Sequence, residues 1–279
     1  MKYIEENSRI WDERSENNDK WSIPVTSEMV KLAREGSWSI VLTPAKPVPA
    51  NWFPDKLEDK KILCLASGGG QQGPILAATG ADVTVLDNSI KQLEKDNLVA
   101  QRDNLKIRTV QGNMQDLSVF ADESFDLTLV LGPMYHLYTK EDKQKAMAEA
   151  IRVTKRGGHI FVAYCMNEAT MLQFVFGKGN LWNCMENHML TEDFHCLSEE
   201  KDLFELSRVE DINALNEQFS DITRVKLVAT DGATNYMREC IDSMDDATFE
   251  MWMKYHFTIC ERQDLIGATH HSLDILQKI

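Results

Sequence analysis

A glycine-rich turn between two apolar runs constrains this chain more than any other feature of its sequence. Residues 61–66 are mostly apolar, residues 68–73 read Gly-Gly-Gly-Gln-Gln-Gly, and residues 83–87 form a second apolar run that ends in Asp87. The pattern predicts a strand, a tight turn, a helix and a second strand. Such a turn lets backbone approach a ligand closely, and the acid lies near a ribose. We therefore expect this unit to bind an adenosine-containing cofactor.

Strands and helices alternate on both sides of this unit. Ser89 is predicted to cap a helix that runs to about Arg102, and Thr139 is predicted to open a helix that ends at Gly157-Gly158. The predicted strands are 61–66, 83–87, 106–111, 125–131 and 159–164. This alternation predicts an α/β fold with a doubly wound, mostly parallel, Rossmann-like sheet.

The pattern changes after residue 164. We expect mostly helix over 167–220, a strand near 223–229, helix again over 233–262, and a last strand over 271–277. The irregular segments, about 167–200 and 233–262, are predicted to be lid insertions over the carboxyl ends of the strands, where ligands bind.

The first 55 residues are polar and contain four tryptophans and a proline-rich run. We expect residues 1–55 to form an N-terminal cap or arm, and residues 56–279 to form the main domain. The tryptophans are predicted to pack this arm rather than to stack on a ligand. They are Trp11, Trp21, Trp38 and Trp52.

Charge and cysteine usage exclude several classes of partner. The chain has 30 basic and 44 acidic residues, a net charge of −14, which disfavours binding to phosphate backbones. No stretch approaches the ~20 apolar residues of a membrane helix, and the acidic start is unlike a signal peptide. The six cysteines contain no CxxC pair and are typical of reduced thiols. We expect a cytoplasmic protein that binds neither nucleic acid nor membranes, with its oligomeric state left open.

Five segments in the right order identify a family resemblance. Residues 62–70, Asp87, 112–114, 125–137 and 151–158 resemble the successive motifs of class I S-adenosylmethionine-dependent methyltransferases, over about residues 60–230. The resemblance implies S-adenosylmethionine as the cofactor and methyl transfer as the reaction. The segment before about Gly132 resembles one subgroup of this family and the segment after it another, as in a recombinant.

The resemblance also implies which residues hold the cofactor. Asp87 corresponds to the ribose-binding acid, Asn113 to the residue near the adenine amino group, and Met114 to one that lies on the ring. The implied set is Ala66, Ser67, Gly68, Gly70, Gln71, Gln72, Asp87, Asn88, Asn113, Met114 and Leu131. Two positions depart from the family pattern, because Cys64 stands where an acid is common and Ala66 replaces the first glycine. Gln71 or Gln72 would then compensate for a weaker grip on the methionine amino group.

Methyl transfer is an in-line displacement that depends mainly on alignment and on exclusion of water. Tyr135 and His136 follow the fourth predicted strand, beside the expected methyl group. His136 is the candidate general base because its reference pKa is near neutral. Tyr135 would orient the substrate or contact the sulfonium. The bland alternative is that one of the two packs under the lid.

No metal site is expected, because Cys184, His188, His195 and Cys196 fit no standard zinc spacing. The leading interpretation is a methyltransferase that acts on a small-molecule acceptor. One alternative is a protein that binds S-adenosylmethionine or S-adenosylhomocysteine without transfer, which the departures at Cys64 and Ala66 keep open. The other is a nicotinamide oxidoreductase that uses the same glycine spacing. Neither the acceptor nor its reacting atom follows from the sequence.

Overall fold

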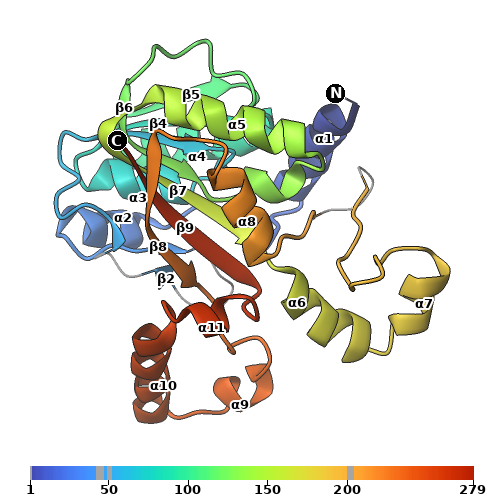
Figure 1. The fold of residues 1–279 in the computed structure, drawn as a ribbon. Coiled ribbons are helices and arrows are strands. Elements are labelled where there is room, and N and C mark those ends of the chain that lie inside the picture. The colour runs from blue at the N-terminus through green and yellow to red at the C-terminus, as the bar shows by residue number, and fades with distance from the viewer. Residues whose placement is uncertain (1, 42–46, 49–51, 200–203) are drawn as a thin grey trace.

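A seven-stranded sheet organises the chain (Figure 1). The computed structural model describes residues 2–41, 47–48, 52–199 and 204–279. The strand order is β5-β4-β3-β6-β7-β9-β8, in which β9 alone runs antiparallel to its neighbours. The strands are β3 (Lys61–Leu65), β4 (Asp82–Asp87), β5 (Ile107–Gln111), β6 (Phe125–Val130), β7 (Thr154–Cys165), β8 (Ile222–Ala229) and β9 (His271–Lys278). The predicted doubly wound, mostly parallel α/β sheet is confirmed.

Alternation along the strands divides the core into two layers. Ile62 and Cys64 of β3 point to one face, where they join buried side chains of α2 (Ser27–Arg34), α3 (Gln72–Ala78) and α4 (Ile90–Asp103). Leu63 and Leu65 point to the other face, which α5 (Lys140–Val153) and α8 (Val209–Asn216) cover. Helices on both faces of a parallel sheet leave its carboxyl edge open for a ligand.

The predicted helix starts are confirmed by their caps. Ser89 Oγ accepts the backbone N–H of Gln92 at 3.1 Å, and Thr139 Oγ1 accepts that of Asp142 at 3.1 Å. The predicted end of the second helix is wrong. It ends at Val153, and Gly157-Gly158 lies inside β7, because Thr154 already pairs with Phe125 of β6.

The N-terminal arm lies along α4. It comprises α1 (Lys2–Glu16), the 3₁₀ turn η1 (Lys20–Ser22), α2, and the short pair β1 (Ile40–Val41) and β2 (Pro47–Val48). Lys95 Nζ of α4 donates to the backbone oxygens of Ser15 and Ser22 at 2.7 and 2.6 Å. Ser15 Oγ donates in return to the backbone oxygen of Lys91 at 3.2 Å. Polar contacts therefore fix the start of the chain to the helix that follows the second strand of the motif.

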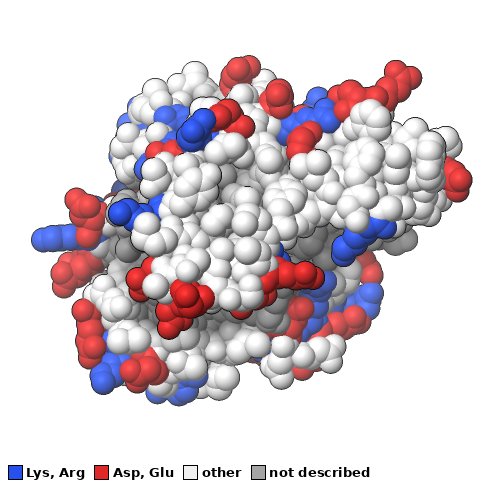
Figure 2. Space-filling model, turned by 90° about the horizontal axis from the view of Figure 1, so that it is seen from below, with Lys and Arg blue, Asp and Glu red and all other residues white. Residues whose placement is uncertain are grey.

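Two helical segments extend from the carboxyl side of the sheet (Figure 1). One holds α6 (Asn167–Thr170), the π-helix η4 (Met171–Phe176) and α7 (Leu181–Glu186). The other holds α9 (Arg238–Asp242), α10 (Asp246–Ile259) and α11 (Gln263–Ile266). Figure 2 shows a face on which charged side chains of both signs are scattered around a broad uncharged area. Within the described ranges, no helix is long and apolar enough to cross a membrane.

A buried ion pair joins the last two strands. Asp274 of β9 is fully buried and accepts two hydrogen bonds from Arg224 of β8, at 2.7 and 2.8 Å, and a third from Asn216 at 2.7 Å. Burial raises the pKa of Asp274, while Arg224 opposes that rise. A carboxylate in such a place depends on its cation, because an unpaired buried charge is costly.

We expect Arg224→Met to lower the free energy of unfolding by about 3 kcal/mol, because Asp274 then stays buried without its cation. Lys226→Met on the same strand is the matched control, since its partner Glu261 is half exposed. That control should cost less than about 1 kcal/mol. Urea unfolding measures both, and equal losses would contradict the account.

Candidate active site

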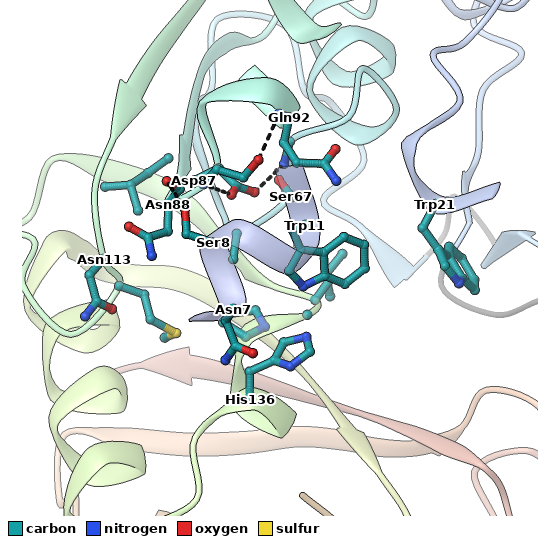
Figure 3. A pocket seen from close by; sticks show the side chains of 18 of the residues that line it. Asn7, Ser8, Trp11, Trp21, Ser67, Asp87, Asn88, Gln92, Asn113 and His136 are labelled. Carbon is teal, nitrogen blue, oxygen red and sulfur yellow. Dashed lines mark hydrogen bonds between the residues drawn. The ribbon is translucent and has the colours of Figure 1, made fainter. Parts of the chain in front are cut away.

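A cavity of about 350 Å³ opens at the carboxyl ends of β3, β4, β5 and β6 (Figure 3). The predicted site residues that line it are Ala66, Ser67, Gly68, Gln71, Gln72, Asp87, Asn88, Asn113, Met114, Leu131, Tyr135 and His136. Gly70 is the exception. Its backbone N–H donates to Asp96 at 3.1 Å and its oxygen accepts from Val25 at 2.8 Å, so it shapes the turn from behind.

The glycine turn is fastened to its neighbours by its own N–H groups. Gly68 donates to Asp87 Oδ2 at 2.9 Å, and Gly69 donates to the backbone oxygen of Gln92 at 2.9 Å. With the bond from Gly70 to Asp96, three successive donors are already used within the protein. The turn therefore holds a fixed shape but offers none of these three N–H groups to a ligand.

Close packing explains why glycine stands at two of these positions. A Cβ on Gly68 would lie 2.6 Å from Cβ of Gln92, and one on Gly73 would lie 2.6 Å from Cγ2 of Val85. Ala66 adopts a φ of 47°, the left-handed conformation that favours glycine. This backbone geometry accounts for the glycine that the family has at that position, and Ala66 holds it at some cost in strain.

Asp87 ends β4 and faces the cavity (Figure 3). Its Oδ2 accepts the N–H of Gly68 and its Oδ1 accepts that of Ser89 at 2.8 Å. Burial raises the pKa of Asp87 to about 6, against the lowering effect of these backbone bonds. Each carboxylate oxygen can accept more than one bond, so the side chain remains competent to bind ribose hydroxyls. Ser89, not Asp87, caps α4.

An acid reaches the glycine turn from α4 rather than from β3. Asp96 is fully buried and accepts the N–H of Gly70, while its Oδ1 has no hydrogen-bond partner in the described part of the chain. Burial raises the pKa of Asp96 to about 8. Burial also raises the pKa of the Cys64 thiol, to about 12, so Cys64 is a neutral core residue. The acid absent from position 64 is thus replaced in space by one 32 positions further along the chain.

The predicted adenine end combines a turn with a buried methionine. Asn113 Oδ1 accepts the backbone N–H of Gln115 at 3.1 Å, and its Nδ2 donates to Gln115 Oε1 at 3.2 Å. Asn113 is therefore a turn residue that also borders the cavity. Met114 is buried beside it.

Aromatic rings enclose the other end of the cavity. Tyr135 and His136 lie on η3 (Pro133–His136), between β6 and α5. The His136 ring meets Trp11 edge to face at a centroid distance of 6.0 Å and Phe204 at 5.5 Å. Tyr135 Oη donates to the backbone oxygen of Leu131 at 3.3 Å, and burial raises the pKa of Tyr135. Both rings therefore line the cavity, as Figure 3 shows for His136.

The sequence analysis missed several lining residues from distant segments. They are Asn7, Ser8, Trp11, Trp21, Gln92, Phe204 and His271. The tryptophan prediction was only half right, because Trp11 and Trp21 border the cavity (Figure 3) whereas Trp38 and Trp52 pack on Phe53 and Phe257. One signal was present. Ser8, Asp12 and Ser15 share a helix face, and all three bond to residues 88–91.

The two segments predicted as lids contribute no described residue to the cavity lining. They carry exposed apolar side chains instead, such as Trp182, which is 72% exposed, and Met251, which is 63% exposed. In the described part of the chain, no three His, Cys, Asp or Glu side chains lie together in a way that could hold a metal ion.

Comparisons with known proteins point in one direction. Residues 63–162 match the family described as "Methyltransferase domain". The "uncharacterized methyltransferase YbaJ" of Bacillus subtilis is 47% identical over 169 residues, which are 61% of this chain and 64% of that protein. The glycine/sarcosine N-methyltransferase of Aphanothece halophytica is 33% identical over 100 residues, 36% of this chain and 38% of that protein. These alignments span less than two thirds of each relative's length.

A likeness in three dimensions extends further. The structure of a SAM-dependent methyltransferase from Methanosarcina mazei superposes with a TM-score of 0.54 and covers 82% of this chain and 95% of that one. Only 14% of the aligned residues are identical, so this likeness concerns the fold. The matched family region contains the glycine turn, Asp87, Asn113 and His136 that border the cavity. The chain therefore belongs to the class I S-adenosylmethionine-dependent methyltransferases.

Proposed function

We propose that this chain transfers a methyl group from S-adenosylmethionine to a small-molecule acceptor. The observation that carries the proposal is the way the glycine turn is used. Its three N–H groups are donated to Asp87, Gln92 and Asp96. Among the described residues that line the cavity, none is a lysine or arginine. Such a site favours a nucleoside cofactor without phosphates.

A nicotinamide dinucleotide needs the opposite arrangement. Its pyrophosphate is bound by backbone N–H groups at the start of the helix after the turn. Here the buried carboxyl of Asp96 lies directly under the turn, and Gly70 does not reach the cavity. The oxidoreductase alternative is therefore disfavoured.

The proposed roles follow the order of the residues along the cavity. Asp87 would accept hydrogen bonds from the ribose, and Asn113 and Met114 would border the adenine. When bound, S-adenosylmethionine supplies a methyl group already activated by its sulfonium. Tyr135 would then orient the acceptor, and His136 would remove a proton from its nucleophilic atom. The aromatic wall of Trp11 and Phe204 excludes water from this step.

A small acceptor suits the enclosed cavity. The N-terminal helix α1 covers one side of it, as the proposed cap, and Phe204 and His271 border the acceptor end. The relative named glycine/sarcosine N-methyltransferase is itself named for small acceptors. We also propose that the segments 167–200 and 233–262 close over this end when the acceptor is bound, which their exposed apolar side chains support.

Calorimetry tests the cofactor. We expect S-adenosylmethionine and S-adenosylhomocysteine to bind with micromolar affinity and NAD not to bind, because the turn offers no pyrophosphate site. Binding of NAD without binding of either sulfur nucleoside would overturn the proposal. Ala66 and its strained backbone keep the binding-only alternative in view, and steady release of S-adenosylhomocysteine in the presence of a metabolite extract separates the two.

Asp87→Asn tests the ribose contact. We expect it to weaken S-adenosylhomocysteine binding by about 1.5–3 kcal/mol, the value of a hydrogen bond to a charged acceptor. The wild-type affinity should fall as the pH drops through about 6, where Asp87 becomes protonated, and the variant should lack this fall. Asp82→Asn, at the exposed start of the same strand, is the matched control. An unchanged affinity in folded Asp87→Asn would remove Asp87 from the site.

His136→Ala tests the proton transfer. We expect turnover with the metabolite extract to fall by about 100-fold, as for loss of a general base, while the affinity for S-adenosylhomocysteine stays within about twofold. His188→Ala is the matched control, since His188 is exposed and does not line the cavity. Intact turnover in His136→Ala would mean that alignment alone suffices.

A further inference from the structure

A second histidine reaches the acceptor end of the cavity from the far end of the chain. His271 is the first residue of β9 and lies opposite Cys165, the last residue of β7. Because β9 runs antiparallel, its start meets the carboxyl edge of the parallel strands (Figure 1). His271 borders the same cavity as Tyr135, His136 and Phe204.

A buried carboxylate holds this imidazole from behind. Asp231 lies just after β8, and its side chain is fully buried. Its Oδ2 is 2.7 Å from the backbone N of His271 and 2.7 Å from Nδ1 of the ring. The two nitrogens of an imidazole point in different directions, so Nε2 is directed away from Asp231. The Cys165 thiol also interacts with the ring, and a thiol is a weak partner that an anion can displace.

His271 carries the positive charge of this group. Burial alone would lower its pKa, but Cys165 and the hydrogen-bonded Asp231 raise the pKa to about 10. Two other histidines lie near Asp231, and burial lowers the pKa of both His256 and His270. At neutral pH the imidazolium is therefore expected at His271, beside the cavity.

The cavity then has two ends of opposite charge. Asp87 supplies a carboxylate at the cofactor end, and no lysine or arginine occurs among the described lining residues. The His271 imidazolium is thus the cation of the acceptor end. The chain has a net charge of −14, so an anionic ligand needs such a local cation to enter. One ring N–H suits a planar carboxylate better than a phosphate, which requires several donors.

We propose that the Asp231–His271 pair is a carboxylate-binding site, so that the methyl acceptor is a small carboxylic acid held by His271. Asp231 acts as the positioning residue, because it orients the ring and keeps it protonated. Trp11, Tyr135 and Phe204 supply an aromatic wall for the body of the acceptor. This inference rests on the proposed function, since it concerns the acceptor of that same reaction.

Paired probes of equal shape test the site. Benzoate and its neutral analogue benzamide are titrated by calorimetry into the protein saturated with S-adenosylhomocysteine. We expect benzoate to bind at least about tenfold more tightly, as for one hydrogen bond between charged groups. The preference should fall to within about twofold in His271→Asn. The matched control His188→Asn changes an exposed histidine outside the cavity and should keep the full preference.

The ionisation of His271 is measured directly by NMR titration of ring-labelled histidine, with His271→Asn used to assign its signal. We expect His271 to stay protonated well above pH 7 in the wild type and to titrate lower in Asp231→Asn. A neutral His271 at pH 7.5 would overturn the proposal, and so would a preference for benzoate that survives in folded His271→Asn. Failure of S-adenosylhomocysteine to bind at all would instead contradict the proposed function.

Discussion

The attachment of the glycine turn to α4 is the constraint on which the site depends. Gly69 donates to the backbone of Gln92 and Gly70 donates to Asp96, so two points of one helix fix the turn between β3 and α3. The N–H of Gly68 is fixed by Asp87 at the end of the neighbouring strand. Without these bonds the turn would have no reason to leave the space that forms the cavity. The same bonds use the donors that a phosphate would need.

The N-terminal arm extends this arrangement to the acceptor end. Lys95, one residue before Asp96, binds backbone oxygens of the arm, and Asp12 accepts the Ser89 hydroxyl at 2.5 Å. These contacts place Trp11 beside His136. One helix therefore positions the cofactor turn through one face and the aromatic wall through another. The arm belongs to the site even though it lies outside the region that matches the family.

The features predicted correctly are those set by neighbours in the sequence. Asp87 and the turn follow strands directly, and Ser89 caps its own helix, so pattern alone located them. Asp96, Asp231 and His271 could not be found that way, because only the sheet brings them to the site from separate segments. The error at Gly157-Gly158 has a local cause. Strand pairing of Thr154 with Phe125 ended the helix before the glycines were reached.

The placement of α1 has a consequence for how the cavity opens. Its Ser8 hydroxyl donates to the backbone oxygen of Asn88, next to Asp87, while Trp11 on the same helix touches His136. Few of its described contacts with α4 are apolar, so detaching the helix exposes little hydrophobic surface and costs mainly hydrogen bonds that water can replace. Because this one helix touches both halves, a displacement that admits the nucleoside also leaves the acceptor half wet.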